Sequence, residues 1–220
     1  MNTRIPVIAI DGPSASGKGT VAQRVALALD WHYLDSGALY RGVAMAAIHR
    51  QLPLESTLEL AHIALNLNIE FPADRILLDG EDVSDSLRAE EVGAAASRVA
   101  AYPEVREALL DRQRAFRQAP GLVADGRDMG SVVFPDARLK IYLTASAEER
   151  AARRYKQLIG KGLGASMGAL LQEILDRDAR DSARAVSPLQ KCADAIELDT
   201  TTLPIEAAVE AVLAAYRTVV

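Results

Sequence analysis

Cysteine is nearly absent from this chain, which has 220 residues and a single thiol, Cys192. One thiol cannot form an internal disulfide, so disulfide-rich secreted folds are excluded and a reducing compartment is indicated. Long apolar runs are also missing: none reaches the ~18 residues that a membrane-spanning helix needs. The first residues lack the charged start and apolar stretch of a signal peptide. We therefore expect a cytoplasmic protein with no membrane segment.

An excess of positive charge is missing as well. The chain has 25 Lys and Arg against 30 Asp and Glu, a formal net charge of −5, which argues against nucleic acid or anionic lipid as a partner. Only 5 of the 25 basic residues are Lys. The remaining arginines offer planar forks of donors that fit phosphate and carboxylate groups. Most are expected on solvated helix faces, but some lie in motifs that a solvated face does not explain.

Short apolar runs alternate with helical patterns along the chain, and no repeat or low-complexity tract interrupts them. The apolar runs lie at 7–10, 31–34, 122–124, 139–143 and 195–198. The helical patterns lie at 17–29, 38–50, 56–65, 89–100, 103–118, 146–160, 168–184 and 204–218. This alternation predicts an α/β fold with a five-stranded parallel sheet flanked by helices. Ligands of such sheets bind beyond the carboxyl ends of the strands, where Asp11, Asp35 and Asp125 follow three of the runs.

A segment at about 67–88 has a different pattern. Leu67, Ile69 and Phe71 alternate with polar residues, which is the period of a half-exposed strand. Asp79-Gly80 is a strong hairpin signal. The expected elements are strands at 67–71, 76–78 and 81–83, with a turn at Pro72-Ala73-Asp74 and the hairpin turn at Asp79-Gly80. We expect a small antiparallel sheet inserted into the α/β framework.

The strongest local motif follows the first apolar run. Residues 12–20 have the spacing G-x-x-x-x-G-K between a predicted strand and a predicted helix, which is the context of a phosphate-binding P-loop. Its glycines let backbone N–H groups face phosphate oxygens, and the helix N-terminus adds a positive dipole end. Lys18 can reach the β- and γ-phosphates. The predicted ATP-binding residues are Gly12, Pro13, Ser14, Ala15, Ser16, Gly17, Lys18, Gly19 and Thr20.

Two further features concern the donor nucleotide and its metal. The chain has no N-K-x-D segment of the kind that regulatory GTPases use, so ATP is the expected donor. Asp125 follows the apolar run Leu122-Val123-Ala124, the pattern of a Walker B carboxylate that holds Mg²⁺ through its water shell. Thr20 and Asp125 are the predicted Mg²⁺ residues. The three histidines lack metal-ligand spacing.

Three other segments accompany the P-loop: 34–41 (LDSGALYR), 124–136 (ADGRDMGSVVFPD) and 177–184 (RDARDSAR), the last followed by Pro188-Leu189. With the G-K-G-T form of the loop at 17–20, they resemble the bacterial type of cytidylate kinases, P-loop nucleoside monophosphate kinases that phosphorylate CMP and dCMP. Their order and spacing match over nearly the whole chain. The resemblance implies one P-loop kinase domain over residues 1–220, with a monophosphate-binding region at about 38–120 and a lid at about 150–165.

The resemblance also implies the roles of individual residues. The acceptor phosphate is matched by Ser36, Arg41, Arg127 and Arg177, the cytosine base by Ser97, Arg106, Asp128 and Arg184, and the sugar by Tyr40 and Asp181. Lys18, Arg127 and Arg177 match catalytic positions. A carboxylate near the exocyclic amine of cytosine would repel the O4 atom of uracil. Within the lid, Arg150, Arg153 and Arg154 precede the possible hinge Gly160-Lys161-Gly162, and which arginine faces the nucleotide is open.

The implied reaction moves the γ-phosphoryl group of ATP directly to CMP or dCMP, in pyrimidine nucleotide metabolism. In-line transfer to a phosphate that is already ionised needs positioning and positive charge rather than a strong general base. A kinase for UMP, AMP or shikimate is an alternative on the same scaffold. An alternative from another class is a nucleotide-gated regulator that binds or hydrolyses ATP. We expect ATP and CMP or dCMP as small-molecule partners, Mg²⁺ as cofactor and a monomeric chain.

Overall fold

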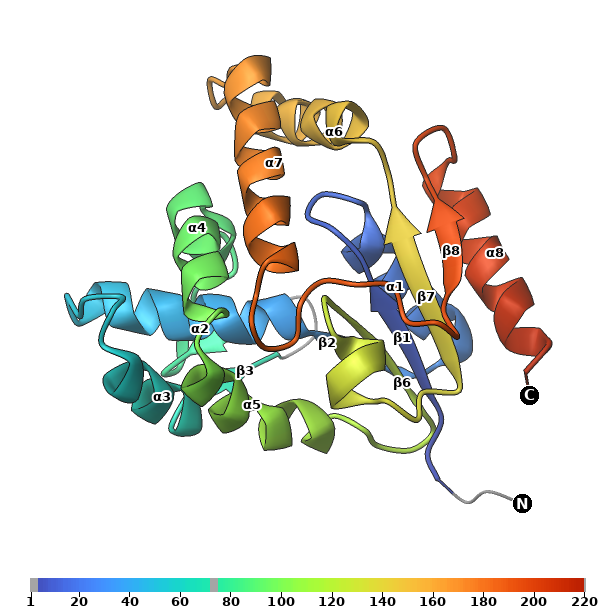
Figure 1. The fold of residues 1–220 in the computed structure, drawn as a ribbon, viewed down its shortest axis with the longest axis horizontal. Coiled ribbons are helices and arrows are strands. Elements are labelled where there is room, and N and C mark those ends of the chain that lie inside the picture. Colours follow the sequence, from blue (N-terminus) through green and yellow to red (C-terminus); the bar gives the residue numbers. More distant parts are fainter. Residues whose placement is uncertain (1–3, 72–74, 220) are drawn as a thin grey trace. The chain divides into compact units, whose positions relative to one another are not determined.

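The computed structural model describes residues 4–71 and 75–219. Packing divides the chain into two compact units, one from Met1–Leu34 with Phe116–Val220 and the other from Asp35–Ala115 (Figure 1). The single kinase domain and the bounds of its subregions stay predictions. Within the described ranges, no helix has both the length and the apolar character needed to cross a membrane.

The first unit is built on the predicted five-stranded parallel sheet. Its strand order is β2 (His32–Asp35), β6 (Leu122–Gly126), β1 (Val7–Asp11), β7 (Leu139–Thr144) and β8 (Ile196–Asp199). Strand β1 is paired in parallel with β6 on one side and β7 on the other. Every residue of β1 and β6 is buried, as expected for parallel strands covered by helices on both faces.

Helices α1 (Lys18–Leu29) and α8 (Ile205–Arg217) pack on this sheet and on each other. Their apolar faces close a core that includes Ile8, Ile10, Val21, Val25, Val123, Ile141, Leu143, Ala208 and Val212. Helices α6 (Ala147–Gly160) and α7 (Met167–Ser182) pack together in the same unit around Ala151, Leu170 and Ile174. Ala15 of the phosphate loop is half-buried against this second cluster, so packing joins the helix pair to the loop.

The second unit contains α2 (Ser36–His49), α3 (Thr57–Leu65), η1 (Ser86–Arg88), α4 (Glu90–Val99) and α5 (Pro103–Ala115). Helix α2 packs against α3 and α4, and α3 packs against α5. The predicted antiparallel insert is present as β3 (Ile69–Glu70), β4 (Leu77–Leu78) and β5 (Glu81–Asp82). Asp79 and Gly80 both have positive φ, as the predicted hairpin turn requires. The predicted turn at Pro72-Ala73-Asp74 lies outside the described residues.

Several element bounds differ from expectation. The predicted strand at 67–71 is paired only over β3, and the helix predicted to reach residue 118 ends at Ala115. The larger difference is η2, a π-helical turn at Met129–Val133 that the sequence did not predict. Its β-branched pair, Val132-Val133, is not typical of helices. The turn therefore depends on contacts from outside its own sequence.

Candidate active site

The phosphate loop lies between β1 and α1, as predicted, and two of its glycines are required by the backbone. Gly12 has φ +157°, and a Cβ atom there would collide with the carbonyl oxygen of Leu143. Gly17 caps α1 at φ +92°, in the left-handed region that other residues rarely adopt. The loop can therefore turn tightly from the sheet into the helix and direct N–H groups at a phosphate.

Two polar groups of the loop are buried in its interior. Lys18 Nζ donates a hydrogen bond to the Pro13 carbonyl at 3.2 Å, so the ammonium group is folded back over the loop. The Ser16 hydroxyl is buried and has no hydrogen-bond partner among the described residues. A buried hydroxyl without a partner is costly. A phosphate oxygen would satisfy the Ser16 hydroxyl, so this orphaned group fits a phosphate ligand.

Arg150 and Arg153 of α6 donate hydrogen bonds to the backbone of the loop. Arg150 Nη1 donates to the Ser14 carbonyl at 3.1 Å and pairs with Asp178 of α7 at 2.6 Å. Arg153 Nη1 donates to the Ser16 carbonyl at 3.1 Å. Two of the three arginines of the predicted lid thus donate to the loop backbone. Because each bond is made to a carbonyl oxygen, both arginines fix the loop that would surround the donor phosphates.

The predicted metal residues lie near the end of β6 and in the first turn of α1. Asp125 is buried near the end of β6 and accepts a hydrogen bond from the Tyr33 hydroxyl at 2.7 Å. Its Oδ2 atom lies 3.9 Å from the position a Cβ atom of Gly19 would take, so the carboxylate is beside the first turn of α1. Thr20 is exposed on that turn. Across residues 4–71 and 75–219 no cluster of three or more His, Cys, Asp or Glu is placed to hold a metal.

Asp125 and Thr20 offer one carboxylate and one hydroxyl. These two groups are too few for a metal site made of protein ligands alone, but they suit Mg²⁺. Mg²⁺ keeps several waters and is commonly bound by one or two carboxylates together with substrate phosphates. Asp125 and Thr20 beside a phosphate loop are such a set. The residues therefore fit a magnesium ion that arrives with a nucleotide.

A buried ionic cluster in the first unit collects four of the predicted acceptor residues. Arg127 Nε donates to Asp181 Oδ2 at 2.8 Å, and Arg184 pairs with the other oxygen of the same carboxylate. Burial raises the pKa of Asp181, but the guanidinium groups of Arg127, Arg184 and Arg177 outweigh it and hold the pKa below its usual value. Asp181, predicted as a sugar contact, thus also orients two arginines.

Asp128, the predicted amine ligand, is buried at the start of η2. Two amides of that turn donate to Asp11 at the end of β1: Met129 N to Oδ1 and Gly130 N to Oδ2, each at 2.8 Å. Burial raises the pKa of Asp11 to about 6, against the lowering effect of these two hydrogen bonds. The position of Asp11 at a strand end was visible in the sequence, but its bonds to a segment more than a hundred residues away were not.

The second unit holds the other predicted acceptor residues. Ser36, Tyr40 and Ser97 are buried, Ser36 and Tyr40 on α2 and Ser97 on α4. The guanidinium of Arg106 on α5 lies 5.5 Å from the centre of the Tyr40 ring, which is a cation–π contact. Arg106 Nη1 also donates to the Ala100 carbonyl at 3.1 Å. The structure therefore brings Tyr40 and Arg106 together.

Arg41, the remaining acceptor residue of this unit, is directed by an acid at the start of its own helix. Asp35 caps α2 by accepting from Ala38 N at 3.1 Å. The second oxygen of Asp35 lies 3.7 Å from Arg41 Nη1. The side chain of Arg41 is 28% exposed. The Asp-Ser-Gly turn thus orients Arg41 while leaving part of its guanidinium exposed.

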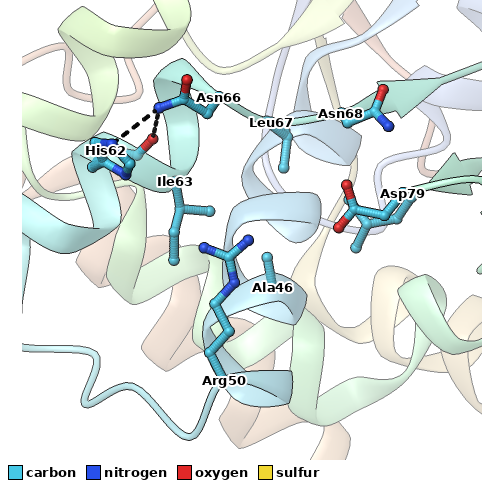
Figure 2. A pocket seen from close by; sticks show the side chains of 9 residues that line it. Ala46, Arg50, His62, Ile63, Asn66, Leu67, Asn68 and Asp79 are labelled. Atoms are coloured by element: carbon cyan, nitrogen blue, oxygen red, sulfur yellow. Dashed lines mark hydrogen bonds between the residues drawn. The ribbon is translucent and has the colours of Figure 1, made fainter.

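A separate cavity of about 130 Å³ lies in the second unit between α2, α3 and the β3–β4 hairpin (Figure 2). Arg50, His62 and Asp79 line it, but all three are exposed. The amide of Asn66 at its edge donates to the His62 carbonyl at 2.9 Å. None of the predicted site residues lines this cavity, and it is not the site that the sequence indicated.

Comparison with known proteins gives matches over almost the whole chain. A sequence model of the cytidylate kinase family matches residues 8–218. A cytidylate kinase from Pseudomonas paraeruginosa is 58% identical over 219 residues, which cover 97% of this chain and 96% of that protein. A cytidylate kinase from Chromobacterium violaceum is 60% identical over 209 residues, covering 95% of this chain and 94% of the relative.

Among solved structures, a gluconokinase from Sinorhizobium meliloti has a similar fold. The TM-score is 0.50 at 15% identity, and the match covers 97% of this chain and 92% of the gluconokinase. At this identity the likeness concerns the fold alone. It agrees with an α/β fold built on a five-stranded parallel sheet.

Proposed function

Because the chain belongs to the cytidylate kinase family, we propose that it transfers the γ-phosphoryl group of ATP to CMP or dCMP, giving CDP or dCDP and ADP. The observation that carries this proposal is the sequence match, which extends from the phosphate loop to the last helix. The reaction belongs to pyrimidine nucleotide metabolism. The contacts of the proposed donor residues and of the proposed acceptor residues support this reaction.

The phosphate loop is the proposed donor site. Backbone amides of residues 14–20, at the end of the loop and the N-terminus of α1, bind the phosphates of ATP. Lys18, buried over the loop, exchanges its bond to the Pro13 carbonyl for the β- and γ-phosphates. Lys18 then neutralises charge that moves during transfer, which is the main requirement of phosphoryl-transfer catalysis.

Mg²⁺ is the proposed cofactor, with Thr20 and Asp125 on its protein side. When bound, it supplies positive charge to the donor phosphates and lowers the repulsion between the two nucleotides. Tyr33 keeps the Asp125 carboxylate oriented through the 2.7 Å hydrogen bond. The Asp125 carboxylate is itself buried.

The acceptor phosphate is proposed to bind to one serine and three arginines. Arg41 and Ser36 of α2, with Arg127 and Arg177, bind the monophosphate, and Arg127 and Arg177 also stabilise the transferred group. A phosphate monoester is ionised at neutral pH, so it needs no general base to become a nucleophile. Asp181 keeps Arg127 in place by its 2.8 Å hydrogen bond, and together with Tyr40 it is the proposed contact to the sugar.

Selection of cytosine is assigned to Ser97, Arg106, Asp128 and Arg184. The exocyclic amine of cytosine is a donor, while its N3 and O2 atoms are acceptors, so a carboxylate beside guanidinium groups complements this edge. Uracil has an oxygen in place of the amine, and a carboxylate there repels it. This repulsion favours CMP over UMP, which is the alternative acceptor whose base is most similar to cytosine.

The product of labelled ATP tests the reaction itself. With γ-labelled ATP, Mg²⁺ and CMP, the label is expected in CDP, and omission of CMP should leave ATP nearly intact. Label released mainly as inorganic phosphate, at a rate independent of CMP, would instead indicate the regulator class. Shikimate and AMP serve as alternative acceptors in the same assay.

The proposal also covers the oligomeric state, location and partners of the protein. We infer a monomer in the cytoplasm whose partners are its small-molecule substrates, with no nucleic acid or membrane. Light scattering after size exclusion measures the mass directly, and 23.6 kDa is the monomer value. A mass twice as large would contradict a monomer.

A further inference from the structure

Asp11 has a place in the site that the phosphate loop does not explain. It is the last residue of β1 and immediately precedes Gly12. Its two carboxylate oxygens accept from the amides of Met129 and Gly130 at 2.8 Å each. Both carboxylate oxygens of Asp11 therefore accept hydrogen bonds from the turn that follows Arg127 and Asp128.

This turn is η2, which has an incomplete cap of its own. Asp128 occupies the position before its first residue, where an aspartate would ordinarily accept hydrogen bonds from the first amides. The side chain of Asp128 makes no such capping bond. Asp11 supplies that capping bond from a different strand, and the first two amides of the turn are satisfied by it.

The backbone of Asp128 is held at the same point. Its carbonyl accepts from Val132 N at 2.9 Å and from Val133 N at 3.2 Å. The η2 turn therefore fixes the backbone of Asp128 as long as η2 keeps its own shape. The Asp11 carboxylate supports that shape through its two hydrogen bonds to the first amides of η2. Gly130 packs closely here, because a Cβ atom would lie 3.4 Å from Asp11 Oδ2 and 3.1 Å from Lys140 Cδ.

We propose that Asp11 is a positioning residue for acceptor selection: by capping η2 from β1, it sets the orientation in which Asp128 meets the cytosine amine. The proposal rests on the assignment of Asp128 to the amine, which belongs to the proposed function. It adds a link between the strand that begins the donor loop and the segment that selects the acceptor.

The donor loop itself does not depend on Asp11 to the same extent. Ser14 and Ser16 carbonyls are held by Arg150 and Arg153, and Thr200 Oγ1 donates to the Ser16 carbonyl at 3.1 Å. Loss of the Asp11 carboxylate leaves these contacts in place. Its effect should therefore fall on CMP more than on ATP, and on selectivity more than on the donor site.

The test compares kcat/KM for CMP and for UMP in Asp11→Asn, with Asp128→Asn measured beside it. Asparagine keeps the shape of aspartate but turns an NH2 group toward one of the two amides, so one hydrogen bond is lost. We expect the CMP-to-UMP ratio to fall about tenfold, as for loss of one hydrogen bond to a charged group. The KM for ATP should change less than about twofold, since its loop contacts remain.

A matched control is Asp199→Asn. Asp199 ends β8 of the same sheet and also accepts from a backbone amide, Thr201 N, at 2.8 Å. This substitution should leave the ratio unchanged. If Asp11→Asn does not fold, Asp11→Glu keeps the charge but moves the carboxylate by one methylene group away from its position against the two amides, and it should lower the ratio as well.

The outcomes separate this inference from the proposed function. An unchanged ratio in Asp11→Asn, or in Asp11→Glu where that variant decides, overturns the positioning role if Asp128→Asn lowers the ratio. An unchanged ratio in Asp128→Asn overturns the assignment of Asp128 and this inference together, while label transfer to CDP still tests the reaction. An equal fall in kcat/KM for CMP and UMP in Asp11→Asn would mean a structural role only.

Discussion

At the scale of single residues, the site is an arrangement of charges that are mostly paired before any nucleotide binds. Asp181 holds Arg127 and Arg184, Asp35 lies beside Arg41, and the Pro13 carbonyl accepts from Lys18. A nucleotide must therefore compete for these donors rather than find them unpaired. The benefit is that each donor is already oriented, which lowers the entropic cost of binding.

Lys18 provides the first prediction at this scale. Lys18→Ala should lower kcat by about a hundredfold to a thousandfold with CMP or dCMP, because it removes a preorganised charge from the transferred phosphoryl group. The measurement is steady-state ADP formation at saturating ATP. Lys191→Ala, at an exposed lysine paired with Glu197, is the control and should retain full activity. Full turnover in Lys18→Ala would exclude this loop as the donor site.

Arg41 and Arg127 should affect the acceptor. In Arg41→Ala and Arg127→Ala, the KM for CMP is expected to rise about tenfold to a hundredfold, from loss of hydrogen bonds between charged groups. Binding of ATP, measured by calorimetry, should be nearly unchanged. Arg50→Ala is a matched control on the same segment as Arg41, since Arg50 follows α2 and lines only the separate cavity. CMP kinetics that stay normal in both variants would contradict the assigned acceptor residues.

Asp11 should make folding stability depend on pH. Its pKa of about 6 in the folded protein exceeds the ordinary value of 3.8, so its contribution to stability is complete below that ordinary value and is lost as pH rises through about 6. Between about pH 4 and pH 7, Asp11→Asn should gain about 2 kcal/mol relative to the natural chain. Denaturant unfolding at both pH values measures this. A stability difference that does not vary with pH would contradict the raised pKa.

At the scale of elements, α6 and α7 are joined to the phosphate loop by polar contacts as well as by packing. Arg150 is buried, pairs with Asp178 of α7 and donates to the Ser14 carbonyl, while Asp178 also accepts from the Ser14 hydroxyl at 3.4 Å. The helix that carries Arg177 and Asp181 is thus tied to the donor loop.

The Arg150–Asp178 pair gives a stability prediction. Asp178→Ala leaves a buried guanidinium without its carboxylate, which typically costs about 3 to 5 kcal/mol. The exposed pair of Arg217 and Glu210 is the control, and Glu210→Ala should cost less than about 1 kcal/mol. Denaturant unfolding of both variants measures the difference. Equal losses would show that the buried pair is no more important than a surface pair.

Elements with a strong local signal were predictable, and elements held by distant contacts were not. The all-apolar run at 7–10 and the loop glycines predicted β1 and the start of α1, because burial and backbone geometry act locally there. Asp79-Gly80 predicted its turn for the same reason. The π-helical η2 was missed, since its cap comes from Asp11 on another strand.

At the scale of the whole molecule, the sequence predicted the class of the fold and the reaction, but not how the strands are ordered. Alternating strands and helices imply a parallel sheet, yet they do not say that β6 lies between β2 and β1. That order places Asp125 opposite Ile10 and Gly126 opposite Asp11. The order therefore explains why the segment with the proposed metal and acceptor residues 125–128 begins beside the phosphate loop.

The most direct test of the central claim is ADP formation with ATP and Mg²⁺ in the presence of CMP, dCMP, UMP, AMP, GMP or no acceptor. Fast turnover with CMP and dCMP, slow turnover with UMP and negligible turnover otherwise is the predicted result. Activity centred on another acceptor would contradict the roles given to Ser97, Arg106, Asp128 and Arg184. Equal ADP formation without an acceptor would contradict phosphoryl transfer to a nucleotide altogether.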